Sequence, residues 1–246
     1  MHLLPLRSDR LSTEISLIAT QAQKVLSLGT AQLGDEYFYQ SLPLCVIDAV
    51  YSIGVRYEGV RNTIGRYCAH FNVQRTRTPR NVLPHKHEQE SVSNFCERFE
   101  QYGSNAMAVE VFRNRQRTSP TNGILKSEGT YLFASVLRRH GVEYLQDIEK
   151  VLDNREFEKA ILAIPGQTSG ISLQYFFMLS GSDDLVKPDR MILGFLKTVL
   201  CRPVRATEAQ QLLAESAAQL RNTYPHLTPR LLDHEIWKYQ RELEDA

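Results

Sequence analysis

The sequence predicts an all-α protein built from many short helices. Apolar residues recur at intervals of three and four along nearly the whole chain, which is the spacing of one helix face, whereas the alternating pattern of a strand is scarce. Proline, glycine and short polar residues stand at the ends of several of these stretches. The 246 residues are enough for one well-buried domain or for two small ones.

The helix ends have physical causes. Pro43 and Pro229 each fall in the first turn behind a capping Ser or Thr, where a proline ring removes no helical hydrogen bond. Gly103 and Gly141 follow periodic stretches, where a left-handed residue ends a helix. The one long irregular stretch, 72–86, is basic and contains proline, so we expect an exposed loop there. Helices are expected at residues 9–29, 42–54, 57–71, 87–102, 105–113, 124–140, 144–153, 155–163, 170–180, 189–201, 206–223 and 229–244.

Composition and charge restrict the function classes only loosely. No apolar run approaches the roughly 20 residues that cross a bilayer, and the first ten residues lack the features of a signal peptide, so we expect a cytoplasmic protein. The net charge of +1 does not by itself indicate a polyanionic partner. Two segments, 75–87 and 113–117, are nevertheless basic and contain no acidic residue.

The four cysteines give no sign of a metal centre. Cys45, Cys68, Cys96 and Cys201 are all far apart in sequence, whereas a zinc or iron–sulfur site normally needs closely spaced thiolates. We therefore expect buried thiols that act as small apolar side chains, with no metal site and no iron–sulfur cluster.

The strongest local pattern lies in residues 155–201. An amphipathic helix runs into Ile-Pro-Gly at 164–166, the polar turn 167–170 follows, and a strongly apolar helix begins at once. Asp189 then stands 19 residues after Gly170, next to a proline and at the start of a further apolar helix. Such a glycine-containing turn gathers backbone N–H groups at a helix N-terminus, which attracts a phosphate, although glycine turns are common in helical hairpins.

These residues resemble the helix–hairpin–helix DNA glycosylase superfamily, which includes endonuclease III, adenine glycosylase and 3-methyladenine glycosylase II. The family hairpin reads roughly Leu-Pro-Gly-x-Gly before a helix, and an essential aspartate follows further along. Ile164-Pro165-Gly166 matches the first half of that hairpin, and Asp189 falls where the aspartate falls. The stretch 187–190, Lys-Pro-Asp-Arg, is most similar to the monofunctional alkylation-repair branch.

The resemblance extends upstream in consistent order. Residues 43–71 are similar to the opening pair of barrel helices in the family, and residues 117–145, with Lys126, are similar to the helix before the hairpin. The fold implied is a six-helix barrel that carries the hairpin, with a second, discontinuous helical lobe. The implied bounds are 40–188 for the barrel and 1–39 with 189–246 for the lobe.

Several positions depart from the family pattern. Gly170 stands where bifunctional members have their Schiff-base lysine, and Lys187 lies at the wrong end of the helix, so the resemblance implies a monofunctional enzyme with water as nucleophile. Thr168 replaces the second hairpin glycine and is less free to adopt positive φ. Gly54 stands where endonuclease III has the glutamine that fills the space of the flipped base, so another residue must fill that space or the substrate is not ordinary duplex DNA.

The resemblance implies three groups of site residues, and each has a structural alternative. Asp189 would stabilise the positive charge that grows on the sugar as the base leaves, or would simply cap a helix. The expected DNA-binding residues, alternatively turn formers or solvated side chains, are Pro165, Gly166, Gln167, Thr168, Ser169, Gly170, Lys187, Arg190 and Lys126. The expected base pocket, alternatively part of the core, comprises Asp48, Tyr51, Tyr57 and Tyr175.

The expected function is therefore hydrolysis of the N-glycosidic bond of a damaged or modified base that has left the stack. The expected partner is DNA, bound by a monomer close to the nucleoid and away from membranes, without a cofactor, although a cation at the hairpin is left open. Repair of alkylated bases and removal of hypermodified bases in defence against phage both fit. The alternative functions are a catalytically inactive helix–hairpin–helix DNA-binding protein and a helical domain with a purely structural role.

Overall fold

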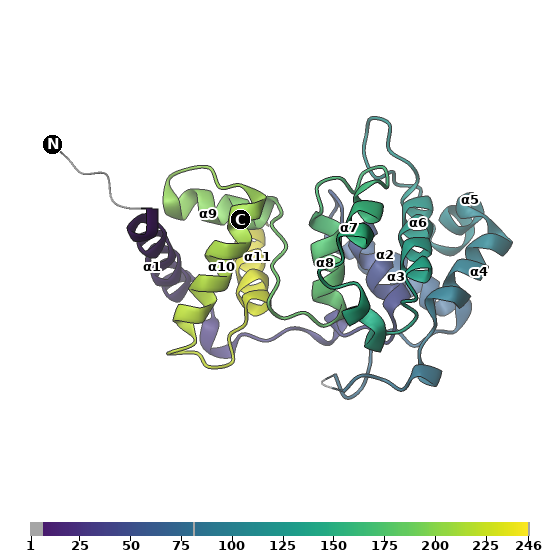
Figure 1. Cartoon of the computed structure of the whole chain (residues 1–246), viewed down its shortest axis with the longest axis horizontal. Helices are drawn as coiled ribbons and strands as arrows, with labels where there is room; N and C mark the ends of the chain where they lie inside the picture. Colours follow the sequence, from purple (N-terminus) through teal and green to yellow (C-terminus); the bar gives the residue numbers. More distant parts are fainter. Residues whose placement is uncertain (1–6, 81, 246) are drawn as a thin grey trace. The chain divides into compact units, whose positions relative to one another are not determined.

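The computed structural model describes residues 7–80 and 82–245 of the chain (Figure 1). Residues 1–6, which begin the segment searched for a signal peptide, lie outside the described residues. Over the described ranges the regular structure is helical, with two isolated β-bridges and no strand. The all-α prediction is thus confirmed, whereas the six-helix barrel stays a prediction.

Most helices begin and end within a few residues of the expected bounds. The α-helices are α1 (Arg7–Val25), α2 (Leu42–Tyr51), α3 (Tyr57–Phe71), α4 (Val92–Tyr102), α5 (Ser104–Ala106), α6 (Lys126–Arg139), α7 (Arg155–Leu162), α8 (Ile171–Ser180), α9 (Arg190–Leu200), α10 (Ala206–Leu220) and α11 (Pro229–Asp245). Short 3-10 helices lie at Leu28–Thr30, Asp35–Tyr37, Lys86–Glu88 and Leu145–Lys150, and a π-helix lies at Met107–Val111.

Two expected helices are wrong in part. Residues 87–91 were expected in a helix, but α4 begins only at Val92, because the Ser91 side chain caps it by accepting a hydrogen bond from the Asn94 N–H at 3.0 Å. The expected helix at 144–153 is a short 3-10 helix instead. There the Asp147 carboxylate accepts the backbone N–H of Tyr144 at 3.0 Å, which fixes a tight turn.

The chain forms two compact units. The terminal unit combines the described residues up to Leu33 with those from Gly181 onward, and the central unit comprises Gly34–Ser180. The sequence analysis placed the corresponding boundaries at residues 40 and 188. Asp189 therefore belongs to the terminal unit, whereas the turn between α7 and α8 belongs to the central unit.

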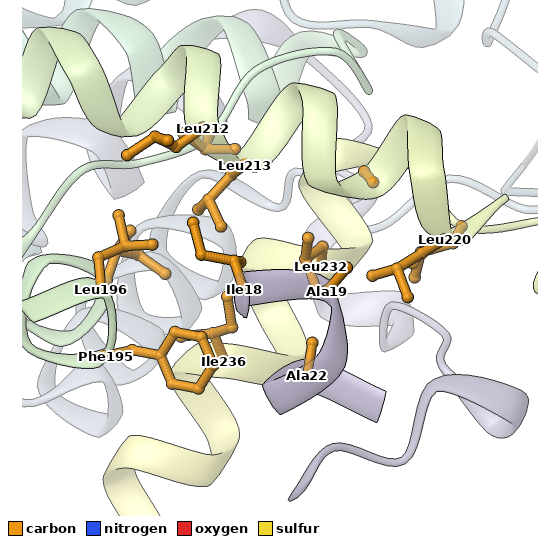
Figure 2. Packing of buried hydrophobic residues seen from close by; sticks show 14 of the residues in the cluster. Ile18, Ala19, Ala22, Phe195, Leu196, Leu212, Leu213, Leu220, Leu232 and Ile236 are labelled. Carbon is orange, nitrogen blue, oxygen red and sulfur yellow. The ribbon is translucent and has the colours of Figure 1, made fainter. Parts of the chain in front are cut away.

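The core of the terminal unit lies between α1, α9, α10 and α11. Figure 2 shows side chains of this core from all four helices, among them Ile18, Leu196, Leu213 and Ile236, and each of these four is buried. The α1 helix contributes small residues such as Ala22, which allow close approach of its neighbours. Burial of the larger aliphatic side chains contributes about 1.5–3 kcal/mol each, and it fixes the frame that carries the start of α9.

The central unit is organised around α2. All ten residues of α2 are buried, and the helix contacts α3, α4, α6 and α8. A helix that is apolar on every side is stable only when it is surrounded by other helices. Asp48 is the one carboxylate within it, so its hydrogen-bond partners matter for the function of this unit. None of the described helices combines the length and apolar character needed to span a membrane.

Candidate functional site

Helices α7 and α8 are joined by an eight-residue connection, 163–170, that contains two left-handed glycines. Gly166 has φ 87° and Gly170 has φ 72°, values that glycine adopts without the strain that a Cβ would cause. The Gln167 N–H donates to the Ile164 carbonyl at 2.9 Å, and the Gly170 N–H donates to the Gln167 carbonyl at 3.0 Å. These two turns connect α7 to α8, so two successive helices with a polar connection are present at this position.

The hairpin residues expected to touch DNA divide into two groups. Pro165, Thr168 and Ser169 are exposed, which suits contact with a phosphate backbone. Gln167 is fully buried, and its Oε1 accepts a hydrogen bond from the Ser172 hydroxyl. The expected DNA contact of Gln167 is therefore wrong, because its side chain fixes the turn from inside.

A basic segment adjoins this hairpin. A Cβ placed on Gly166 would lie 2.4 Å from the Thr118 Cβ, so the backbone of the turn packs closely on the chain at Thr118. The residues just before Thr118 include Arg113, Arg115 and Arg117, all three of which are exposed. We call these three the arginine run. The sequence analysis noted its charge, and the structure shows that the chain directly after it packs against the turn at Gly166.

Asp189 is the N-cap residue of α9. Its Oδ1 accepts hydrogen bonds from the backbone N–H groups of Met191 at 2.9 Å and Ile192 at 3.3 Å. The residue is only half-buried. Its capping role is thus present, and its side chain is oriented by the first turn of α9 rather than free to rotate.

Three side chains from α10 and α11 hold the segment that leads to Asp189. Gln210 accepts the Val186 N–H at 2.9 Å and donates to the Asp184 carbonyl at 2.8 Å. The Arg230 guanidinium donates to the Asp183 carboxylate at 3.3 Å, and the Arg230 backbone N–H also donates to the Asp183 carbonyl at 3.1 Å. The third side chain is Asp233, which accepts the Lys187 N–H at 2.8 Å. Hydrogen bonds therefore hold the backbone of residues 183–187 in place just before Asp189.

Asp233 is an unusual carboxyl group for this position. It is only 7% exposed, and the negative charge of Asp189 lies close by. Burial first and that charge second raise the pKa of Asp233 to about 8, although the bond from the Lys187 N–H and the charges of Lys187 and Arg230 act in the opposite direction. The terminal unit thus carries, close to Asp189, a buried carboxyl group that holds a proton at neutral pH.

Two of the cations expected to bind DNA have protein partners instead. The Lys126 side chain is 1% exposed, and its ammonium donates to the carbonyls of Tyr51 at 2.9 Å and Ile53 at 2.7 Å. It therefore satisfies the carbonyl end of α2, and the expected DNA contact is corrected. The exposed Arg190 is bidentate on Glu244, at 2.5 and 3.0 Å, so binding DNA would require it to leave that partner.

Three of the four expected pocket residues meet in the central unit. The buried Asp48 carboxylate accepts hydrogen bonds from Tyr175 at 3.4 Å and Tyr57 at 3.5 Å, but also from Tyr39 at 2.8 Å and Ser52 at 2.7 Å. Burial together with the charge of Asp48 raises the pKa of the Tyr39 and Tyr175 hydroxyls well above the usual value, so both stay donors. Tyr39 was not singled out from the sequence. Ser52 follows Asp48 by one helical turn, so this contact is a local one.

The remaining aromatic residues of this region separate into a surface pair and a core residue. Tyr57 stacks on Tyr37, with ring centroids 5.6 Å apart and planes 12° apart, and both residues are half-buried. Tyr51 instead packs against Phe112 in the core, and its hydroxyl has no hydrogen-bond partner among the described residues. The structure thus places Tyr51 in the core, which is the alternative that the sequence analysis named for the pocket residues.

The basic stretch 72–86 is not simply a solvated loop. Arg77 is buried, and its side chain donates to the carbonyls of Arg80 at 2.9 Å and Tyr39 at 3.5 Å. Two guanidinium nitrogens of Arg75 are also buried. These two arginines support the fold near Tyr39, so charge reversal there tests stability rather than DNA contact. Of the cysteines, Cys201 is exposed and the other three are buried, which corrects the expectation for Cys201.

Comparison with known proteins gives a family without a described activity. A family model described as "Domain of unknown function (DUF8548)" matches residues 16–241, which spans parts of both units. No curated protein and no solved structure matches the chain.

Proposed function

We propose that the chain, which belongs to the DUF8548 family, is a monofunctional DNA glycosylase that removes a damaged or modified base with Asp189. The observation that carries the proposal is the setting of Asp189. Its carboxylate is held at the start of α9 by two backbone N–H groups, on a segment fixed by Gln210, Arg230 and Asp233. A charge that must stabilise a transition state acts best when it needs no reorganisation.

The reaction that fits this carboxylate is hydrolysis of the bond between sugar C1′ and the base nitrogen. As the bond breaks, its electron pair leaves with the base and positive charge grows on the sugar ring. The fixed negative charge of Asp189 stabilises that cation, and its carboxylate orients the water that forms the new C1′–O bond. The water gives one proton to the departing base, directly or through solvent, so the products are the free base and an abasic sugar.

The hairpin and the arginine run supply the phosphate-binding surface in this proposal. The turn has three exposed residues, Pro165, Thr168 and Ser169, that can meet a phosphate backbone. The arginine run, which precedes the Thr118 contact of this turn, adds exposed positive charge. Arginine suits this task because its guanidinium binds phosphate through two parallel hydrogen bonds. Pairing of the target base must be lost before Asp189 can act, since the sugar carbon is not accessible in a stacked duplex.

The proposed enzyme has no strand-cleaving activity of its own. Gly170 offers no amine at the position where the resemblance implies a nucleophile. Lys187 follows 17 residues later, after α8, on a backbone that is held by Asp233. We therefore expect no covalent adduct with DNA under borohydride. Strand breaks should appear only after alkali opens the abasic site, and an adduct would contradict the use of water as nucleophile.

A base-release screen tests the proposed function. Purified protein is incubated with genomic DNA from several sources, including alkylated DNA and DNA of phages with modified bases, and released bases are identified by mass spectrometry. We expect release of at least one base by the wild type and by Asp184→Asn, a control in the same segment with an exposed side chain, but not by Asp189→Asn. Tight DNA binding without any release would favour the catalytically inactive DNA-binding alternative instead.

A further inference from the structure

The side of α11 that meets the start of α9 carries a carboxyl group, Asp233, that takes no part in the bond-breaking step of the proposed reaction. We propose that Asp233 is a positioning residue for Asp189, because its carboxyl group fixes the backbone at Lys187, two residues before the reacting side chain. The inference rests on the proposed function of Asp189. Asp233 touches neither DNA nor water of the reaction, and it acts only through the segment that it holds.

Three contacts align the start of α9 along one stripe of α11. The Lys187 N–H binds Asp233, the Arg190 guanidinium binds Glu244, and a Cβ on Gly194 would lie 3.5 Å from the Gln240 Oε1. Residues 233, 240 and 244 fall on one face of a helix with 3.6 residues per turn. Asp189 lies between the first two contacts in sequence, so α11 holds the chain on both sides of it.

The hydrogen bond of Asp233 fixes the backbone two residues before the reacting side chain. The Lys187 N–H donates to its Oδ1 at 2.8 Å, in a part of the terminal unit where Asp233 is buried. A buried backbone N–H without an acceptor costs free energy, so this hydrogen bond stabilises the observed position of the segment. Small displacements of a catalytic group cost much of its rate, which is why a fixed backbone here matters.

The charges around Asp233 favour its neutral form beside Asp189. Burial and the negative charge of Asp189 raise the pKa of Asp233 to about 8, while Lys187 and Arg230 are the cations that face it. A proton on the carboxyl group leaves Oδ1 able to accept the Lys187 N–H, and it avoids two adjacent negative charges. Above about pH 8 the second charge appears, which repels both Asp189 and DNA phosphates. We therefore expect base release to decline on the alkaline side.

Nuclear magnetic resonance of the full chain tests the carboxyl pair without any need for activity. With ¹³C-labelled aspartate carboxyls, one resonance should titrate near pH 8 in the wild type and be missing in Asp233→Asn. In Asp189→Asn, the same group should titrate at least about 1 pH unit lower, since a neighbouring negative charge has gone. Titration of Asp233 in the ordinary carboxylate range, or an identical titration in Asp189→Asn, would overturn the proposal.

Single-turnover base release tests the positioning role. Asp233→Ala removes the acceptor of the Lys187 N–H, and we expect the rate at pH 7 to fall about 10-fold or more with little change in the Kd for DNA. Asp233→Asn restores a carbonyl acceptor, so it should recover most of that loss and should also lack the alkaline decline. Glu235→Ala is the matched control, because it removes a buried carboxylate of α11 whose partner is Lys238, and its rate should match the wild type. Equal rates for Asp233→Ala and Glu235→Ala would refute positioning.

Failure of the proposed function can be told apart from failure of this inference. If the wild type releases no base from any DNA, the glycosylase proposal fails, and amide hydrogen exchange then decides the positioning claim. Exchange at residues 187–192 should rise about 10-fold or more in Asp233→Ala but not in Glu235→Ala, because only the first variant frees the segment. Unchanged exchange in Asp233→Ala would overturn the inference by itself.

Discussion

The buried carboxyl of Asp233 predicts a specific dependence of stability on pH. Its pKa is about 8 in the folded chain against 3.8 in an exposed reference, so folding favours the protonated form. The stabilising contribution is fully present below about pH 4 and is lost as the pH rises through about 8. Between these limits the folded state holds one more proton than the unfolded state. The free energy of unfolding should therefore fall by about 1.4 kcal/mol per pH unit through this group alone.

The assay is urea unfolding of the wild type and Asp233→Asn at pH 5, 6, 7 and 8. The amide of the variant does not titrate, so we expect its stability relative to the wild type to rise by about 3–4 kcal/mol from pH 5 to pH 8. Glu90, whose pKa burial raises to about 7, adds its own pH dependence, but this is common to both proteins and cancels in the difference. A difference that stays constant from pH 5 to pH 8 would refute the assigned protonation of Asp233.

Three further variants test the hairpin, the buried lysine and the arginine run. Gly166→Ala should cost roughly 2 kcal/mol or more in unfolding free energy, measured in urea, because its φ is positive and its Cβ would meet Thr118; a neutral effect would contradict the close approach. Lys126→Met should cost about 2–4 kcal/mol, because it leaves two buried carbonyls without their donor, and a stability equal to the wild type would show that the ammonium is not needed there. Charge reversal at Arg113 and Arg115 should weaken DNA binding and reduce the slope of log K against log salt by about 2, whereas an unchanged slope in fluorescence anisotropy would remove the arginine run from the DNA surface.

The sequence was sufficient wherever short-range rules decide the structure. The 3.6-residue pattern and the Pro and Gly positions predicted α2, α3 and α9 to α11 closely, because capping and amphipathic spacing are local properties. The start of α4 was missed, since the competing Ser91 cap lies inside an equally periodic stretch.

The site residues depended on contacts that are remote in sequence. Lys126 is a type that normally faces solvent, and only the tertiary structure places the carbonyls of Tyr51 and Ile53, 75 and 73 residues earlier, beside it. Gln167 is a local exception, because its partner Ser172 is only five residues away. Asp233 is one polar residue in an amphipathic helix, and its partner, the Lys187 N–H, is 46 residues away. A buried carboxylate inside an apolar run, as at Asp48, was the one case where composition alone indicated an unusual environment.

Single-turnover base release by Asp189→Asn, on whichever DNA the wild type acts upon, tests the central claim most directly. The amide keeps the size of the side chain and can still cap α9, so the fold should remain while the negative charge is lost. We expect the rate constant to fall about 100-fold or more, with DNA affinity equal to the wild type or higher. Base release by Asp189→Asn at the wild-type rate would show that this carboxylate does not perform the chemistry, and the proposed mechanism would be wrong.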